Sequence, residues 1–91
     1  MDIHQLKLVA GRVRDLLQQS NHPVGHNQSL DLVAALPGLR NWPEVQAFPD
    51  RVGACELDVG SAGRLAFRLK KKFELALSPQ AMLAAVSPSG G

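Results

Sequence analysis

The chain has 91 residues, which suits one small domain with a single hydrophobic core and excludes a deep enclosed cleft. Hydrophobic residues make up 45% of it and aromatic residues only 4%, and the abundance of Leu, Ala and Val favours helices over a sheet. The formal net charge of +2 is too small by itself to indicate a nucleic-acid-binding protein. The placement of the basic residues therefore matters more than their sum.

The first two predicted helices are marked by their ends. Asp2 and Gln5 form a capping box in front of an apolar pattern at helical spacing over about residues 3–20. A second helix is expected at about residues 27–36. It stops at Pro37 and the glycine that follows, because glycine readily takes the left-handed conformation that ends helices.

A third, short helix is expected at about residues 42–48. Asn41 and Glu44 form its capping box, and Pro43 is tolerated in a first turn whose amides lack partners anyway. Trp42 is the only tryptophan in a chain with few aromatic residues. We therefore expect it to fill the core rather than to stack on a ligand.

The second half predicts a connection and then two helices. Residues 49–58 are expected to be a loop or a stray strand, because one strand of that length has no evident pairing partner. Asp58 or Ser61 can cap a helix over about residues 59–73. Ser78, followed by a proline, predicts a last helix that ends at about Val86.

These elements predict an all-α fold, a small single domain of four or five short helices over residues 1–86. Its three-helix half is expected at about residues 3–48 and its two-helix half at about residues 58–86. Residues 87–91 have nothing to bury, and we expect a disordered tail there.

The compartment is indicated by cysteine usage and hydropathy. Cys55 is the only cysteine, so an intrachain disulfide is excluded and a reducing cytoplasm is expected. The first residues carry charges throughout, and no apolar run is long enough for a signal peptide or a membrane span. We therefore expect a cytoplasmic protein without membrane contact.

Two segments in the first half, LKLVAGRVRDLL and VGHNQSLDLVAALPGLRNWPEV, resemble a helical accessory segment of bacterial glyoxalase-related family proteins, over about residues 6–46. The matching residues are Leu6, Lys7, Ala10, Arg12, Arg14, Leu17, His26, Gln28, Leu30, Leu32, Val33, Ala34, Gly38, Arg40, Asn41 and Trp42. The catalytic part of that family is a metal-binding αβ-barrel module, for which 91 residues leave no room. The resemblance therefore implies a shared helical accessory unit without glyoxalase activity.

The residue types that carry enzyme chemistry form no recognisable pattern. His22 and His26 lie four residues apart, but Pro23 and Gly25 interrupt the helix that would bring them together, and no third ligand is near. Cys55 has no activating partner in the sequence, so we expect a buried, unreactive thiol. The carboxylates are scattered singly, without an acid and base pair. We expect no metal, no cofactor and no enzyme activity.

Two patterns that can indicate nucleic-acid or anion binding are weak here. The helix pair at residues 27–48 has the spacing of a helix-turn-helix motif, but its second helix, WPEVQAF, carries Glu44 and no basic side chain. Gly60 and Gly63 lie at a helix start beside Arg64, where unpaired amides could hold an anion. Two glycines are more often only a flexible helix start.

The strongest candidate site is the basic face of the helix at residues 59–73. At about 100° per residue, apolar residues share one face of this helix and cations share the other, with Phe67 exposed beside Lys71. The candidate partner-binding residues are Arg64, Phe67, Arg68, Lys71 and Lys72. A solvated face without a ligand is the alternative, because charged outer faces are ordinary.

We therefore expect a non-catalytic helical interaction module, a regulatory or accessory protein, that docks an acidic protein partner through this basic face. The alternative is a small nucleic-acid-binding regulatory protein that uses the same face together with Arg12 and Arg14. Phosphate binding would weaken steeply with salt, whereas a packed protein interface would not. An enzyme is the third alternative.

Overall fold

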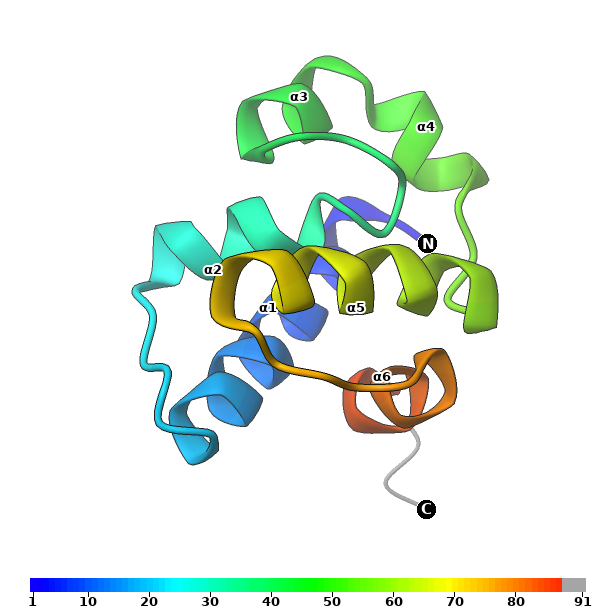
Figure 1. Ribbon diagram of the computed structural model, residues 1–91. Coiled ribbons are helices and arrows are strands. Elements are labelled where there is room, and N and C mark those ends of the chain that lie inside the picture. Colours follow the sequence, from blue (N-terminus) through cyan, green and yellow to red (C-terminus); the bar gives the residue numbers. More distant parts are fainter. Residues whose placement is uncertain (88–91) are drawn as a thin grey trace.

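The computed structural model describes residues 1–87, which form six helices and no strand (Figure 1). The helices are α1 (Ile3–Gln19), α2 (His26–Val33), α3 (Trp42–Ala47), α4 (Pro49–Ala54), α5 (Val59–Phe73) and α6 (Pro79–Val86). The predicted all-α class is confirmed. No helix of the described part is long and apolar enough to cross a membrane.

The predicted helix starts are confirmed by their caps. Asp2 caps α1 and Asp58 caps α5, each in a complete capping box, in which the residue three positions later reaches back to the capping residue. The side chain of Asn41 accepts from the Glu44 amide at 3.0 Å, but the Glu44 side chain accepts from the Arg40 amide, so only half of the capping box predicted there forms. Ser78 accepts from an amide of α6 at 3.1 Å. These bonds satisfy first-turn amides that have no partner within their helix.

Asp58→Ala is expected to lower the free energy of unfolding by about 1 kcal/mol, because the amide of Ser61 would lose its acceptor. Urea denaturation followed by circular dichroism measures the change. Asp50→Ala is the control, since the exposed Asp50 carboxylate does not cap a helix start. Equal stability of Asp58→Ala and the parent would show that this cap contributes nothing.

The second helix ends through a tightened last turn. After Val33 the amides of Ala35 and Leu36 bond to carbonyls three residues earlier, as in a 3₁₀-helix. Gly38 then takes a left-handed conformation with φ of 81°, and the amides of Gly38 and Leu39 bond back to the preceding turn. This pattern is a Schellman motif, and it confirms the stop predicted at Pro37 and Gly38.

The expectation of four or five helices missed α4. Residues 49–54 were expected to belong to a connection, but Pro49 occupies the first turn of a helix, where its fixed φ is suitable. Val52 is fully buried and anchors this helix on the core. The following residues 55–57 are a loop, as one of the two readings of this segment predicted.

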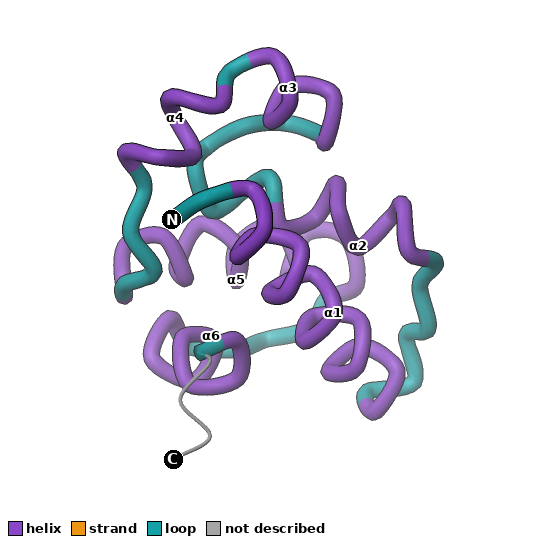
Figure 2. Tube along the Cα trace, turned by 180° about the vertical axis from the view of Figure 1, so that it is seen from behind, coloured by secondary structure: helices purple, strands orange, loops and turns teal. Residues whose placement is uncertain are grey.

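The elements pack around one aliphatic core. Figures 1 and 2 show α3 and α4 together on one side of α2 and α5, with α6 on the opposite side of α5. The largest fully buried side chains are Leu6, Val13, Leu17, Leu32, Val33, Leu36, Val45, Val52, Leu65, Leu69, Met82 and Val86. They come from all six helices and from the turn after α2, so every helix buries one face in the core.

Trp42 does not fill the core, contrary to the expectation from its uniqueness. Its side chain is half-buried and packs against the outside of the core cluster. Its backbone amide donates to the Asp31 side chain at 2.8 Å. Branched and linear aliphatic side chains fill the interior instead, so the tryptophan covers its edge.

The C-terminal end of α6 is joined to α1. The Ser87 carbonyl accepts a hydrogen bond of 2.9 Å from the Arg12 guanidinium. Of the predicted tail at residues 87–91, positions 88–91 lie outside the described residues.

Candidate functional site

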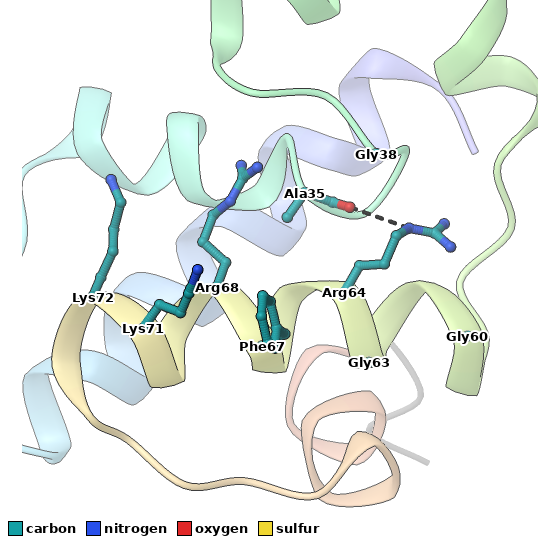
Figure 3. A pocket seen from close by; sticks show the side chains of 9 residues that line it. All are labelled: Ala35, Gly38, Gly60, Gly63, Arg64, Phe67, Arg68, Lys71 and Lys72. Atoms are coloured by element: carbon teal, nitrogen blue, oxygen red, sulfur yellow. Dashed lines mark hydrogen bonds between the residues drawn. The ribbon is translucent and has the colours of Figure 1, made fainter.

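The candidate site is an open hollow between α5 and the carboxyl end of α2 (Figure 3). Its volume is about 700 Å³. The residues that line it are Ala35, Gly38, Gly60, Gly63, Arg64, Phe67, Arg68, Lys71 and Lys72. All five residues that were predicted from the sequence to bind a partner thus lie around one hollow, which we call the basic hollow.

Helical periodicity explains how α5 presents these side chains. Arg64, Arg68 and Lys72 follow one another at intervals of four residues and so lie on one face. The opposite face carries Leu65, Ala66 and Leu69, which are buried. The two faces predicted for this helix are therefore confirmed.

The two arginines are held by main-chain carbonyls in the last turns of α2 and in the segment that follows it. Arg64 donates from Nε to the Leu36 carbonyl at 3.0 Å, with further bonds from Nη2 to the same oxygen and from Nε to the Ala35 carbonyl. Arg68 donates from its two Nη atoms to the carbonyls of Leu39 at 2.9 Å, Asp31 at 3.1 Å and Arg40 at 3.3 Å. The last carbonyls of a helix lack intrahelical donors and carry partial negative charge, so two cations are favoured there.

This arrangement differs from the alternative reading, in which the basic face is only solvated. Arg68 is half-buried and Arg64 is exposed, and both guanidinium groups donate to main-chain oxygens. These bonds could not be predicted from the sequence, because the acceptors lie 28 to 37 residues away and are carbonyls that every residue carries.

The other end of the basic hollow is open to water. Phe67 is 62% exposed, and the Lys71 ammonium lies 5.3 Å from the centre of its ring, a cation–π contact. Lys72 is exposed as well. Among residues 1–87 none of the four cations forms an ion pair with a carboxylate. The expected exposure of Phe67 beside Lys71 is confirmed.

The histidines lie apart from this site. His22 is half-buried, and its ring packs at 5.5 Å from that of Phe73, while His26 is exposed at the start of α2. In the described part of the chain, no group of three His, Cys, Asp or Glu residues could hold a metal ion.

Cys55 is a buried thiol, as predicted. Its sulfur donates to the Leu36 carbonyl at 3.4 Å. Burial raises the pKa of the Cys55 thiol, and the neighbouring Arg64 guanidinium offsets only part of that rise. Because the thiolate is the reactive form, Cys55 is poorly suited to act as a nucleophile.

The start of α5, with its two glycines, is capped by a carboxylate. The Asp58 carboxylate accepts from the Ser61 amide at 2.9 Å, so the helix start already holds a negative charge. A side-chain carbon at Gly63 would lie 3.6 Å from the Pro79 ring, which is an ordinary packing distance, so α6 does not require a glycine there. The negative charge of the Asp58 cap is the feature that disfavours an anion site at this helix start.

The polar residues of the motif around Trp42 build the connection between α2 and α3. The Asp31 carboxylate accepts from the Trp42 amide, and the Glu44 carboxylate accepts from the Arg40 amide at 3.0 Å. Asn41 caps α3. These side chains hold a turn, so the motif marks a fold more than a binding surface.

A comparison with protein families shows which family the chain belongs to. The family model described as glyoxalase superfamily protein matches residues 1–76, which include α1 to α5. The chain belongs to this family. The match confirms the resemblance seen in the first half and extends it through α4 and α5, where the sequence had suggested no family. A search among curated proteins and another among solved structures found no match.

The basic hollow of this glyoxalase superfamily protein lies within the matched segment, since all its lining residues fall between 35 and 72. Helix α6 lies outside the match, although Met82 and Val86 are fully buried in the core. The matched segment therefore carries the candidate site, and α6 completes the core beneath it.

Proposed function

We propose that this glyoxalase superfamily protein is a non-catalytic interaction module that docks an acidic protein partner at the basic hollow. The observation that carries the proposal is an exposed aromatic ring, Phe67, which has the Lys71 ammonium 5.3 Å from its centre and shares its hollow with three further cations; none of the four forms an ion pair among residues 1–87. Such a surface is complementary to a segment that places carboxylates around one apolar side chain.

The physical argument has two parts. Unpaired cations attract an acidic segment over a distance of about 10 Å and speed its association. Burial of the Phe67 ring by an apolar side chain then supplies the short-range contact, since buried aromatic residues dominate many interfaces. Among residues 1–87, no histidine, cysteine or carboxylate lines the hollow, so the lining residues offer neither a nucleophile nor an acid and base pair.

The position of Arg12 in the fold favours a protein partner over nucleic acid. The nucleic-acid alternative used Arg12 and Arg14 to extend the basic surface. Arg12 is half-buried and donates to the Ser87 carbonyl between α1 and α6. Arg12 is therefore less able to contact a phosphate, and binding of a nucleic-acid backbone needs several such contacts.

The test is fluorescence anisotropy with a labelled peptide in which four glutamates flank one leucine. We expect it to bind, and a peptide with glutamines in place of the glutamates to bind at least about tenfold more weakly. Phe67→Ser should weaken binding by about tenfold without lowering the melting temperature, because the ring is exposed.

Phe48→Ser is the matched control. Phe48 is 51% exposed and also lies near a cation, with the Arg51 guanidinium 5.9 Å from its ring, but it does not line the basic hollow. Equal binding of the two peptides, or an equal loss in both serine variants, would contradict the proposal. Tighter binding of a single-stranded oligonucleotide, with a steep log-linear salt dependence, would favour nucleic acid instead.

A further inference from the structure

We propose that the cations of the basic hollow divide into two pairs with different tasks, an inference that rests on the proposed docking function. Arg64 and Arg68 are positioning residues that hold α5 against the end of α2. Lys71 and Lys72, together with Phe67, make the contact with the acidic partner.

Hydrogen bonds hold Arg64 and Arg68 against main-chain carbonyls. Leu36 lies in the last turn before the Schellman glycine, and its carbonyl receives bonds from the Arg64 side chain and the Cys55 thiol. Arg68 reaches three carbonyls on both sides of the same turn. A carboxylate that drew these guanidiniums away would leave partly buried carbonyls without donors, and an unsatisfied buried polar group is costly.

Arginine suits this task because its planar group donates in several fixed directions at once. A lysine ammonium is a compact charge on a flexible stem and cannot span the same acceptors. Figure 3 shows the Arg64 side chain extending from α5 toward the turn that contains Ala35 and Gly38. The arginines thereby set the width of the hollow by fixing the distance between its two walls.

The lysine pair has no such commitment to the backbone. Within residues 1–87, Lys71 makes a cation–π contact with Phe67 and neither lysine hydrogen-bonds to a carbonyl, and both lysines are exposed. A carboxylate can approach the Lys71 ammonium while an apolar neighbour covers the ring, so charge and apolar contact are available at one place. Lys72 lies one residue further along α5 and can take a second carboxylate.

Two double variants with the same loss of charge test the division. Lys71→Gln with Lys72→Gln should weaken binding of the glutamate peptide at least about tenfold and leave the melting temperature within about 2 °C of that of the parent. Arg64→Gln with Arg68→Gln should lower the melting temperature by at least about 5 °C. At a temperature well below its melting midpoint, this folded arginine variant should lose clearly less affinity for the peptide than the lysine variant loses.

A charge-conserving variant covers the case in which the arginine double variant does not fold. Arg64→Lys with Arg68→Lys keeps both charges but replaces the planar guanidinium groups, which donate several hydrogen bonds at once. This variant should therefore still lower the melting temperature. It should also speed amide hydrogen exchange in the turn at residues 34–39 more than in α1. Its affinity for the glutamate peptide should match that of the parent.

The outcomes separate this inference from the docking function. If the folded arginine variant loses as much affinity as the lysine variant, or if both arginine variants keep the parent's melting temperature, the division is wrong. If the parent does not prefer the glutamate peptide, the docking function is wrong, and so is the contact role proposed for Lys71 and Lys72. The melting and exchange measurements test the positioning role of Arg64 and Arg68 independently of any peptide.

Discussion

A chain that ends after residue 77 retains the whole family-matched segment, and we expect it to lose cooperative thermal unfolding. Met82 and Val86 are fully buried, and α6 packs against both α5 and α1. Each such side chain contributes about 1.5–3 kcal/mol through burial, and its removal uncovers apolar surface on two other helices. Against a total stability of about 5–15 kcal/mol for a small domain, a loss of about 5 kcal/mol is decisive.

Thermal melts followed by near- and far-ultraviolet circular dichroism measure this effect. Met82→Ala in the full chain should reproduce part of it, with a cost of about 2–5 kcal/mol. Ala84→Ser, at an exposed position of the same helix, is the control and should cost well under about 1 kcal/mol. A truncated chain that melts as sharply and at the same temperature as the parent would show that α1 to α5 form a complete core.

Leu32→Ala is expected to lower the free energy of unfolding by about 3–4 kcal/mol. Leu32 is fully buried in α2, and its truncation would leave a cavity that the close-packed aliphatic side chains around it cannot fill without strain. Urea denaturation followed by circular dichroism measures the change, with the slope of the transition as a check that unfolding remains two-state.

Leu8→Ala makes the same chemical change in α1, where Leu8 is 54% exposed. It should alter stability by at most about 0.5 kcal/mol, because little apolar surface is buried there and alanine is a good helix former. Similar losses in the two variants would mean that Leu8 is also covered, for instance by a second chain. An unchanged midpoint in Leu32→Ala would contradict the packing of α2 described above.

The local signals in this sequence determined the starts of α1, α3 and α5 and the faces of α5. Asp2, Asp58 and Asn41 each bond to an amide three residues later, so their partners lie within one turn and can be identified from sequence spacing alone. The same holds for the alternation of buried leucines and exposed cations along α5, because helical geometry fixes it before any packing occurs. The family resemblance in the first half was likewise carried by contiguous motifs.

Tertiary structure alone decided which members of the basic face hydrogen-bond to the main chain. Arg64, Arg68, Lys71 and Lys72 are equivalent as cations at helical spacing, but only the arginines lie where carbonyls of the turn after α2 approach α5. Trp42 was likewise expected inside, and the fold placed it at the edge because aliphatic side chains from six helices already filled the interior. Both outcomes depend on contacts between segments far apart in the chain, and such contacts leave no periodic or capping signal in the residues that make them.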